Sequence, residues 1–146
     1  MRKTGKELYQ DLILEHGKAP RNEGPLDGAT NEATAKNPLC GDRVTLRLAI
    51  DANGIAEARF EARGCMIARA SASLLTEAVR GKSAADALLL AAALAAALEG
   101  AERPMPPMLE ALAGAREFPA RRACVLLPWK ALRSALDGYI PTISRS

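Results

Sequence analysis

The residues best suited to chemistry in this sequence are three cysteines, Cys40, Cys65 and Cys124, each beside a predicted boundary between a loop and a regular element. An odd set of widely spaced cysteines cannot pair off completely, and such a set favours metal binding, redox chemistry or nucleophilic use over a disulfide framework. Cys65 stands at a predicted helix start, where unpaired backbone N–H groups and the helix dipole favour a thiolate. We therefore expect the pKa of the Cys65 thiol to be lowered.

A carboxylate accompanies the first cysteine. In Cys40-Gly41-Asp42 the two flanking side chains are two positions apart and can point to one side, while Gly41 permits an unusual φ. Three sulfurs and one oxygen would fill the four positions that zinc prefers, and the same soft donors suit an iron-sulfur cluster. The competing interpretation is an interaction module in which the thiols are small buried hydrophobes and Asp42 caps a turn.

Other chemistry has less support in the sequence. His16 is expected to be a half-buried residue of the first helix and no ligand. Ser71 and Ser73 have no acid or histidine base in evident reach, which argues against a serine nucleophile. The glycines match neither of the phosphate-binding motifs, so nucleotide binding is not expected.

Composition excludes two broad classes of function. The chain of 146 residues carries a formal net charge of +3 and only 3% aromatic residues, too little basic and stacking surface for a nucleic-acid binder. Its longest uncharged apolar run, Ala87 to Leu98, is too short to cross a bilayer, and the N-terminus shows no targeting segment. We expect a cytoplasmic protein without a membrane partner.

The first half of the chain reads as one helix followed by a small sheet. Thr4 and Glu7 form a capping-box pattern that opens a helix ending near Gly17, and residues 19–28 form a loop. Alternating apolar residues then predict strands, and Asn53-Gly54 predicts the turn of a hairpin. The strand ranges are Ala29–Lys36, Val44–Ile50 and Ile55–Ala62, the last with Ala56, Ala58 and Phe60 on its inner face.

The second half is helical. Three helices are predicted over Cys65–Arg80, from the Ser83 cap to Glu99, and over Pro107–Ala113. The second is apolar on nearly all sides, so it should be sandwiched between other elements or against a second copy in a homo-oligomer.

Pro128 shapes the prediction for the last helix. It has no N–H for the carbonyl of Cys124, so this helix should begin near Leu127 or Pro128 and leave Cys124 in the preceding loop or in a distorted first turn. The predicted fold is α+β, a small antiparallel sheet packed on one face by helices. Residues 1–138 form one domain, and 139–146 form a loosely ordered tail.

Over residues 7 to 136 the motifs, in order, resemble the IscU/SufU/NifU-N-terminal family of iron-sulfur cluster assembly proteins. The resemblance is carried by Leu8-Tyr9, His16, Pro20-Arg21-Asn22, Asn37-Pro38-Leu39-Cys40-Gly41-Asp42, Gly64-Cys65, Ala70-Ser71-Ala72-Ser73, Phe118-Pro119-Ala120-Arg121, Cys124 and Trp129-Lys130-Ala131-Leu132. It implies a metal site of three cysteines and one aspartate, which map to Cys40, Asp42, Cys65 and Cys124.

Two features are similar to the SufU branch: Ala123, and no histidine, precedes the third cysteine, and the segment from Cys65 to Cys124 accommodates an extra helix. That branch implies zinc and a sulfur relay fed by a pyridoxal-phosphate cysteine desulfurase, with downstream assembly or recipient proteins. The IscU branch implies instead a scaffold that builds a [2Fe-2S] cluster. Ala123, Leu126 and Pro128 depart from the SufU pattern, which puts the surroundings of Cys124 and the docking face in question. Cys40, on a glycine-containing loop that can move, is the expected sulfur acceptor.

Overall fold

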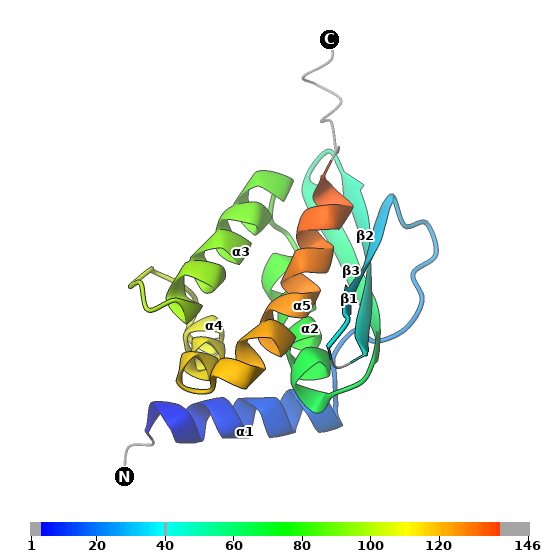
Figure 1. The fold of residues 1–146 in the computed structure, drawn as a ribbon. Helices are drawn as coiled ribbons and strands as arrows, with labels where there is room; N and C mark the ends of the chain where they lie inside the picture. Colours follow the sequence, from blue (N-terminus) through cyan, green and yellow to red (C-terminus); the bar gives the residue numbers. More distant parts are fainter. Residues whose placement is uncertain (1–3, 40, 138–146) are drawn as a thin grey trace.

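The structure, a computed structural model, describes residues 4–39 and 41–137. Figure 1 shows a three-stranded sheet with helices packed beside it. In chain order the elements are α1 (Gly5–Lys18), β1 (Asn31–Asn37), β2 (Asp42–Asp51), β3 (Gly54–Arg63), α2 (Met66–Val79), α3 (Ala84–Leu98), α4 (Pro107–Leu112), a 3₁₀ turn (Ala113–Glu117) and α5 (Pro119–Leu136). The α+β prediction is confirmed.

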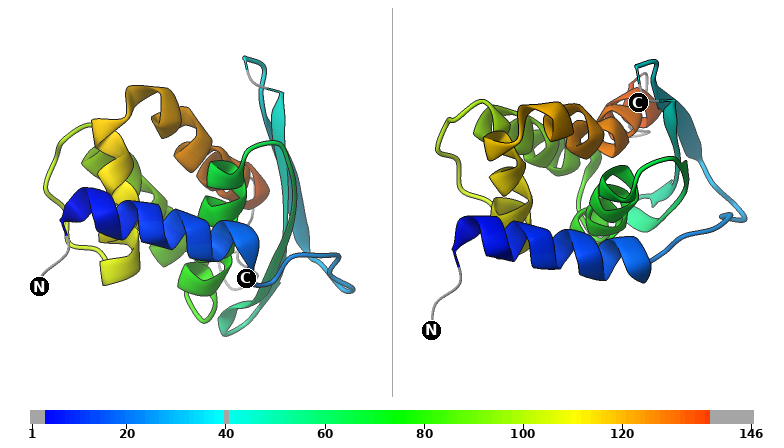
Figure 2. Two further views of the ribbon diagram at one scale, coloured as in Figure 1. Left: turned by 90° about the horizontal axis from the view of Figure 1, so that it is seen from below. Right: turned by 60° about the horizontal axis from the view of Figure 1, so that its bottom comes forward.

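The sheet has the order β1-β2-β3 and is antiparallel throughout, as the hairpin pattern predicts. Its apolar face carries Val44, Leu46, Leu48, Ala58 and Phe60, all buried, and Figure 2 shows the helices gathered on one side of the strands. Each strand of such a sheet presents alternate side chains to the core and to the outside.

The inner face predicted for β3 is wrong at one position. The register shifts between Ala49 and Ile50, which pair with Glu57 and Ile55, so Ala56 has no partner of its own. This β-bulge turns Ala56 outward, where it is exposed, and places Ile55 in the core.

The far end of α2 is tied to the same hairpin. Ile55 donates its N–H to the Lys82 carbonyl at 2.8 Å, and Gly81 donates to the Ile55 carbonyl at 2.7 Å. A Cβ on Gly54 would lie 2.6 Å from the Lys82 carbonyl oxygen, so the turn needs glycine both for this approach and for its φ of 115°. The hairpin therefore fixes where α2 ends.

The predicted start of the last helix is wrong. α5 begins at Pro119 and runs to Leu136 with Pro128 inside it, so Cys124 is helical. An interior proline costs a helix about 3 kcal/mol, but α5 buries Val125, Leu127, Trp129 and Leu132 against the sheet and α2, which outweighs that cost. In Figure 1 the first turns of α5 run in a different direction from the rest, as an interior proline produces.

α3 is covered on one side only. Its Ser83 cap is as predicted, with the hydroxyl accepting from Asp86 N–H, and Ala87, Ala91 and Leu94 are buried. Leu89, however, is 68% exposed, so within the described residues the helix is not sandwiched. None of the helices in the described ranges has the length and hydropathy to cross a bilayer.

One further prediction is confirmed, and two others concern residues that the structure does not describe. The capping box of Thr4 and Glu7 is present at the start of α1. Residues 139–146, the predicted tail, lie outside the described residues, as does Cys40.

Candidate metal centre

Three of the four predicted ligands meet at one end of the sheet. Asp42 opens β2, Cys65 lies between β3 and α2, and Cys124 lies in the first half of α5. One ligand atom from each of these residues lies within 4.8 Å of the other two. The fourth predicted ligand, Cys40, is outside the described residues, but its neighbour Gly41 immediately precedes Asp42 at this end.

Asp42 is held by the backbone around Cys65. Its Oδ1 accepts the Cys65 N–H at 3.0 Å, and the side chain is buried. Gly64 makes this contact possible, because it has a φ of 115° and a Cβ there would lie 2.0 Å from Asp42 Oδ1. The Gly64-Cys65 pair thus brings the start of α2 directly onto the carboxylate.

Cys65 is the N-cap of α2 and not part of the helix itself. Its sulfur accepts the Ala68 N–H at 3.4 Å, the N-cap bond expected of a side chain at this position. The pKa of the thiol is nevertheless raised, because burial outweighs that backbone N–H and the Asp42 carboxylate adds to the rise. The prediction of a lowered pKa for the metal-free protein is therefore wrong. A bound divalent cation would favour the thiolate instead.

Cys124 is positioned by the packing of α5 on α2. Its Sγ lies 3.6 Å from Asp42 Oδ2, and its side chain is 7% exposed. One residue further on, the Val125 carbonyl accepts a hydrogen bond from Ser71 on α2 at 2.6 Å, and Ser71 in turn accepts one from Trp129 Nε1 at 3.1 Å. Sequence reasoning found little support for Ser71 as a nucleophile. In the structure its hydroxyl joins α2, the helix capped by Cys65, to α5.

Two aromatic residues that sequence reasoning left unassigned stack on each other, and one of them, Tyr9, lies within electrostatic range of the thiols. Tyr9 is 1% exposed and stacks on Phe118 with ring centroids 5.6 Å apart, and the Arg121 guanidinium lies 4.6 Å from the Phe118 centroid. Burial raises the pKa of Tyr9, Arg121 opposes the rise, and charge on Cys124 and Cys65 adds to it. The Leu8-Tyr9 motif was the available signal, but its spacing from the cysteines gives no hint of contact.

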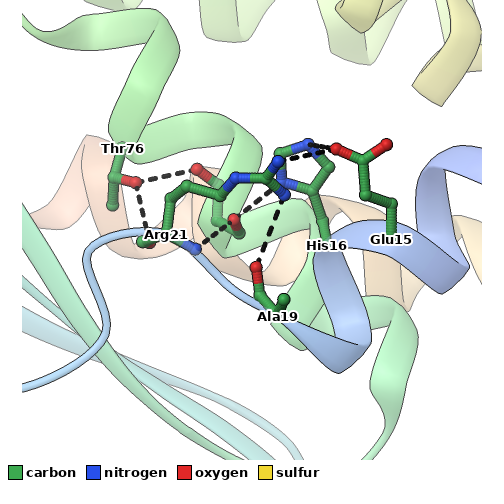
Figure 3. A network of polar contacts seen from close by, with 6 residues as sticks. Glu15, His16, Ala19, Arg21 and Thr76 are labelled. Carbon is green, nitrogen blue, oxygen red and sulfur yellow. Dashed lines mark hydrogen bonds and ion pairs between the residues drawn. The ribbon is translucent and has the colours of Figure 1, made fainter.

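His16 and Ser73 form a separate buried contact, and Figure 3 shows the network around His16, with Glu15, Arg21 and Thr76. The His16 Nδ1 lies 2.8 Å from Ser73 Oγ, which also accepts the Arg21 N–H at 2.8 Å. A histidine is therefore within reach of Ser73, contrary to the prediction. Ser73 is fully buried and already bonded to the backbone, so the contact anchors α1 to α2 and offers no nucleophile. His16 is no ligand of the Asp42 group among the residues described.

The donor set fits a metal ion. Two sulfurs and one carboxylate oxygen suit a borderline-soft cation such as zinc, whose Zn–S bonds of about 2.3 Å place sulfurs roughly 3.8 Å apart in a tetrahedral site. The observed separations below 4.8 Å lie close to that spacing. Asp42 Oδ1 is occupied by the Cys65 N–H, which leaves Oδ2 turned toward Cys124. The three residues would hold a cation with one further ligand.

Residues 8–142 match the NifU-like N terminal domain. The chain belongs to this family. The relatives of this chain include proteins named for both expected branches. One is the zinc-dependent sulfurtransferase SufU of Bacillus subtilis, 39% identical over 132 residues that cover 88% of this chain and 89% of the relative. Another is the iron-sulfur cluster assembly scaffold protein IscU of Thermotoga maritima, 32% identical and covering 90% and 94% of the two chains.

A solved structure of a protein named for the SUF system shares the fold. FiSufU, from the thermophile Fervidobacterium islandicum AW-1, superposes with a TM-score of 0.82 at 30% identity and covers 91% of this chain and 99% of its own. The resemblance to IscU, SufU and NifU N-terminal proteins is thus confirmed, and the chain is a member of the family of iron-sulfur cluster assembly proteins.

Proposed function

We propose that this protein is a zinc-binding sulfur acceptor in iron-sulfur cluster assembly, supplied by a pyridoxal-phosphate cysteine desulfurase. The observation that carries the proposal is the convergence of Asp42, Cys65 and Cys124 on one point. The naming of the Bacillus relative as a zinc-dependent sulfurtransferase supports it. Cys40 completes the ligand set and accepts the sulfur, which then passes to downstream assembly or recipient proteins in the cytoplasm.

The transfer step is a thiol exchange without net oxidation. The Cys40 thiolate attacks the outer sulfur of a persulfide on the donor cysteine, a new S–S bond forms, and the donor cysteine leaves as a thiolate. Support for Cys40 comes from its neighbours: the N–H groups of Leu39 and Gly41 bond Asn37 at 3.1 and 2.8 Å, and Gly41 has a φ of 72°. A turn of this kind can open more readily than a helix start such as Cys65.

Zinc, when bound, keeps the thiolates deprotonated and subdues their nucleophilicity, so we expect the partner to free Cys40 before the sulfur moves. The chain's own residues do the rest: Gly64 and the Cys65 N–H orient Asp42, and Ser71 holds Cys124 toward it.

Metal analysis of freshly purified protein tests the site. We expect about one zinc per chain, lost in Cys65→Ser. Asp is the hardest ligand toward this cation, so Asp42→Ala should leave a tighter, less exchangeable ion than the cysteine replacements do. Protein that binds no metal under any condition would support buried thiols in an interaction module instead.

The alternative function is a scaffold that assembles a [2Fe-2S] cluster itself, the role that the name of the Thermotoga relative gives to that protein. Anaerobic incubation with iron, cysteine and a desulfurase separates the two functions. Faster desulfurase turnover with zinc retained supports the relay, whereas a stable coloured cluster on the protein supports the scaffold.

A further inference from the structure

Three cations lie side by side on the outer face of the sheet. The register pairs Lys36 of β1 with Arg43 of β2, and Arg43 with Arg63 of β3, and all three side chains are exposed. We call these three residues the basic row. Neighbouring strands are about 4.8 Å apart, so the row spans roughly 10 Å across the sheet.

Among the described residues, none of the three cations of the basic row takes part in an ion pair. Four positions further along β2 the situation is different, because Arg47 there is ion-paired with Glu32 of β1 and Glu61 of β3. Like charges directly opposite each other destabilise a sheet; Arg47 also faces Arg59, but its two ion pairs offset that repulsion, whereas the basic row has none among the described residues.

The two glutamates in the hollow beside the row are already ion-paired with other arginines. A shallow hollow beside Arg43 and Arg63 also contains Glu61 and Glu23. Glu61 is bound by Arg47, and Glu23 is bound by Arg69 of α2. Neither Glu61 nor Glu23 therefore forms an ion pair with the basic row, whose side chains are exposed.

The row lies at the same end of the sheet as the metal centre. Arg43 directly follows Asp42, and Arg63 is separated from Cys65 by Gly64 alone. Lys36 directly precedes Asn37, whose carbonyl and side chain accept the N–H groups of Gly41 and Leu39, the two neighbours of Cys40 in the sequence. A macromolecule bound to the basic row would therefore lie next to Leu39 and Gly41, the neighbours of the proposed sulfur acceptor Cys40.

We propose that the basic row docks an acidic helix of the sulfur-donor protein, presented as carboxylates on one helix face. This inference rests on the proposed function, because it names the surface that brings the donor to Cys40. Carboxylates at positions i and i+3 or i+4 of a helix are about 5–6 Å apart, which matches the spacing of the cations. Charges at the rim of an interface speed association and fix register more than they add to affinity.

The test uses the double variant Lys36→Glu/Arg63→Glu. Because this variant places Arg43 between two carboxylates, it should fold at least as well as the original chain. The matched control is Arg103→Glu/Arg133→Glu, with the same change in net charge at exposed positions of the segment after α3 and of α5. Binding of each full-length protein to the purified cysteine desulfurase of the same organism is followed by surface kinetics at several salt concentrations.

The proposal predicts association on the order of tenfold slower for the Lys36/Arg63 variant, with a weaker salt dependence, and little change for the control. Zinc content and the sulfur accepted at saturating desulfurase should stay as in the original chain. Equal association rates for the two variants would overturn the inference, as would a stronger effect of the variant on binding of a short RNA duplex than on the desulfurase. A failure of the proposed function appears separately, as an unaltered chain that accepts no sulfur even at saturating desulfurase.

Discussion

α2 is anchored on two sides by two serines of similar burial, and the two contacts do different work. Toward α5, Ser71 bonds the Val125 carbonyl and Trp129 Nε1, next to Cys124. Toward α1, Ser73 bonds His16 and the backbone N–H of Arg21. The first contact contains no group that titrates near neutral pH, whereas the second includes a histidine.

The two contacts should therefore affect different properties. The α5 contact should affect the geometry of the proposed metal site, and the α1 contact should affect how stability depends on pH. The α5 side sets the distance between two proposed ligands, because Cys65 caps α2 and Cys124 precedes Val125. The α1 side sets how the N-terminal helix sits on α2, and with it the position of Tyr9. A substitution on the α5 side should change zinc binding, whereas a substitution on the α1 side should change the pH dependence of stability and leave zinc binding as it is.

The largest effect is expected from a change that touches neither anchor. Gly64→Ala places a methyl group 2.0 Å from Asp42 Oδ1 at a φ of 115°, so it should destabilise the fold by about 3 kcal/mol or more and displace Asp42 from Cys65. Denaturant unfolding and zinc content would measure the two effects.

Gly100→Ala is the matched control for backbone strain. Gly100 has a φ of 99°, and a Cβ there would meet nothing within 4 Å. We expect about 1–2 kcal/mol of destabilisation and unchanged zinc content. If both substitutions cost the same and both retain zinc, the contact between Gly64 and Asp42 does not matter to the site.

A smaller effect is expected on the α5 side. Ser71→Ala leaves the buried Val125 carbonyl and Trp129 N–H without their partner, which should cost about 1–3 kcal/mol and speed zinc loss through Cys124. The exposed Ser134→Ala should stay within about 0.5 kcal/mol. A zinc off-rate unchanged in Ser71→Ala would show that Cys124 is held by other contacts.

The smallest effect belongs to the α1 side and depends on pH. The pKa of His16 is lowered, mainly by burial and then by Arg21, so below its ordinary value of 6.5 the unfolded chain binds more protons than the folded one. Stability should therefore fall as pH drops from about 6.5 toward the folded pKa. The loss should be measurable as a decreasing denaturation midpoint between neutral and mildly acidic pH.

His16→Gln removes this titration, so the stability of the variant should change less with pH across that window than that of the original chain. Zinc content at neutral pH should not change, since His16 lies on the side of α2 away from α5. Parallel pH profiles for the two proteins would mean that the histidine is protonated equally in the folded and unfolded states.

Local signals predicted much of this fold because local physics decided it. The Thr4 cap, the Asn53-Gly54 turn and the Ser83 cap each satisfy backbone groups within a few residues, and the structure has all three. The bulge at Ala56 was missed because it depends on register between strands. The start of α5 was missed because the cost of Pro128 is local, whereas the burial that offsets it comes from α2 and the sheet.

The site was predictable in its ligands and not in its supports. Residue types and motif order pointed to Asp42, Cys65 and Cys124, and the structure brings these three together. Nothing in the sequence connects Ser71 to Val125, which lie far apart in the chain and meet only when α5 packs on α2. The raised pKa of Cys65 was missed for the same reason, because burial is a property of the folded protein.

The double attachment of α2 to the hairpin bears on the order in which the protein folds. Asp42 bonds Cys65 at one end of α2, and Ile55 bonds Gly81 and Lys82 at the other, so the segment from 42 to 82 is closed by contacts of short sequence separation. Short loops cost less entropy to close than the one that joins α2 to α5. The hairpin and α2 should thus form a cooperative unit whose amides are protected from exchange before those of α5. Asp42 and Cys65, two of the proposed ligands, would then be in place before Cys124 completes the site.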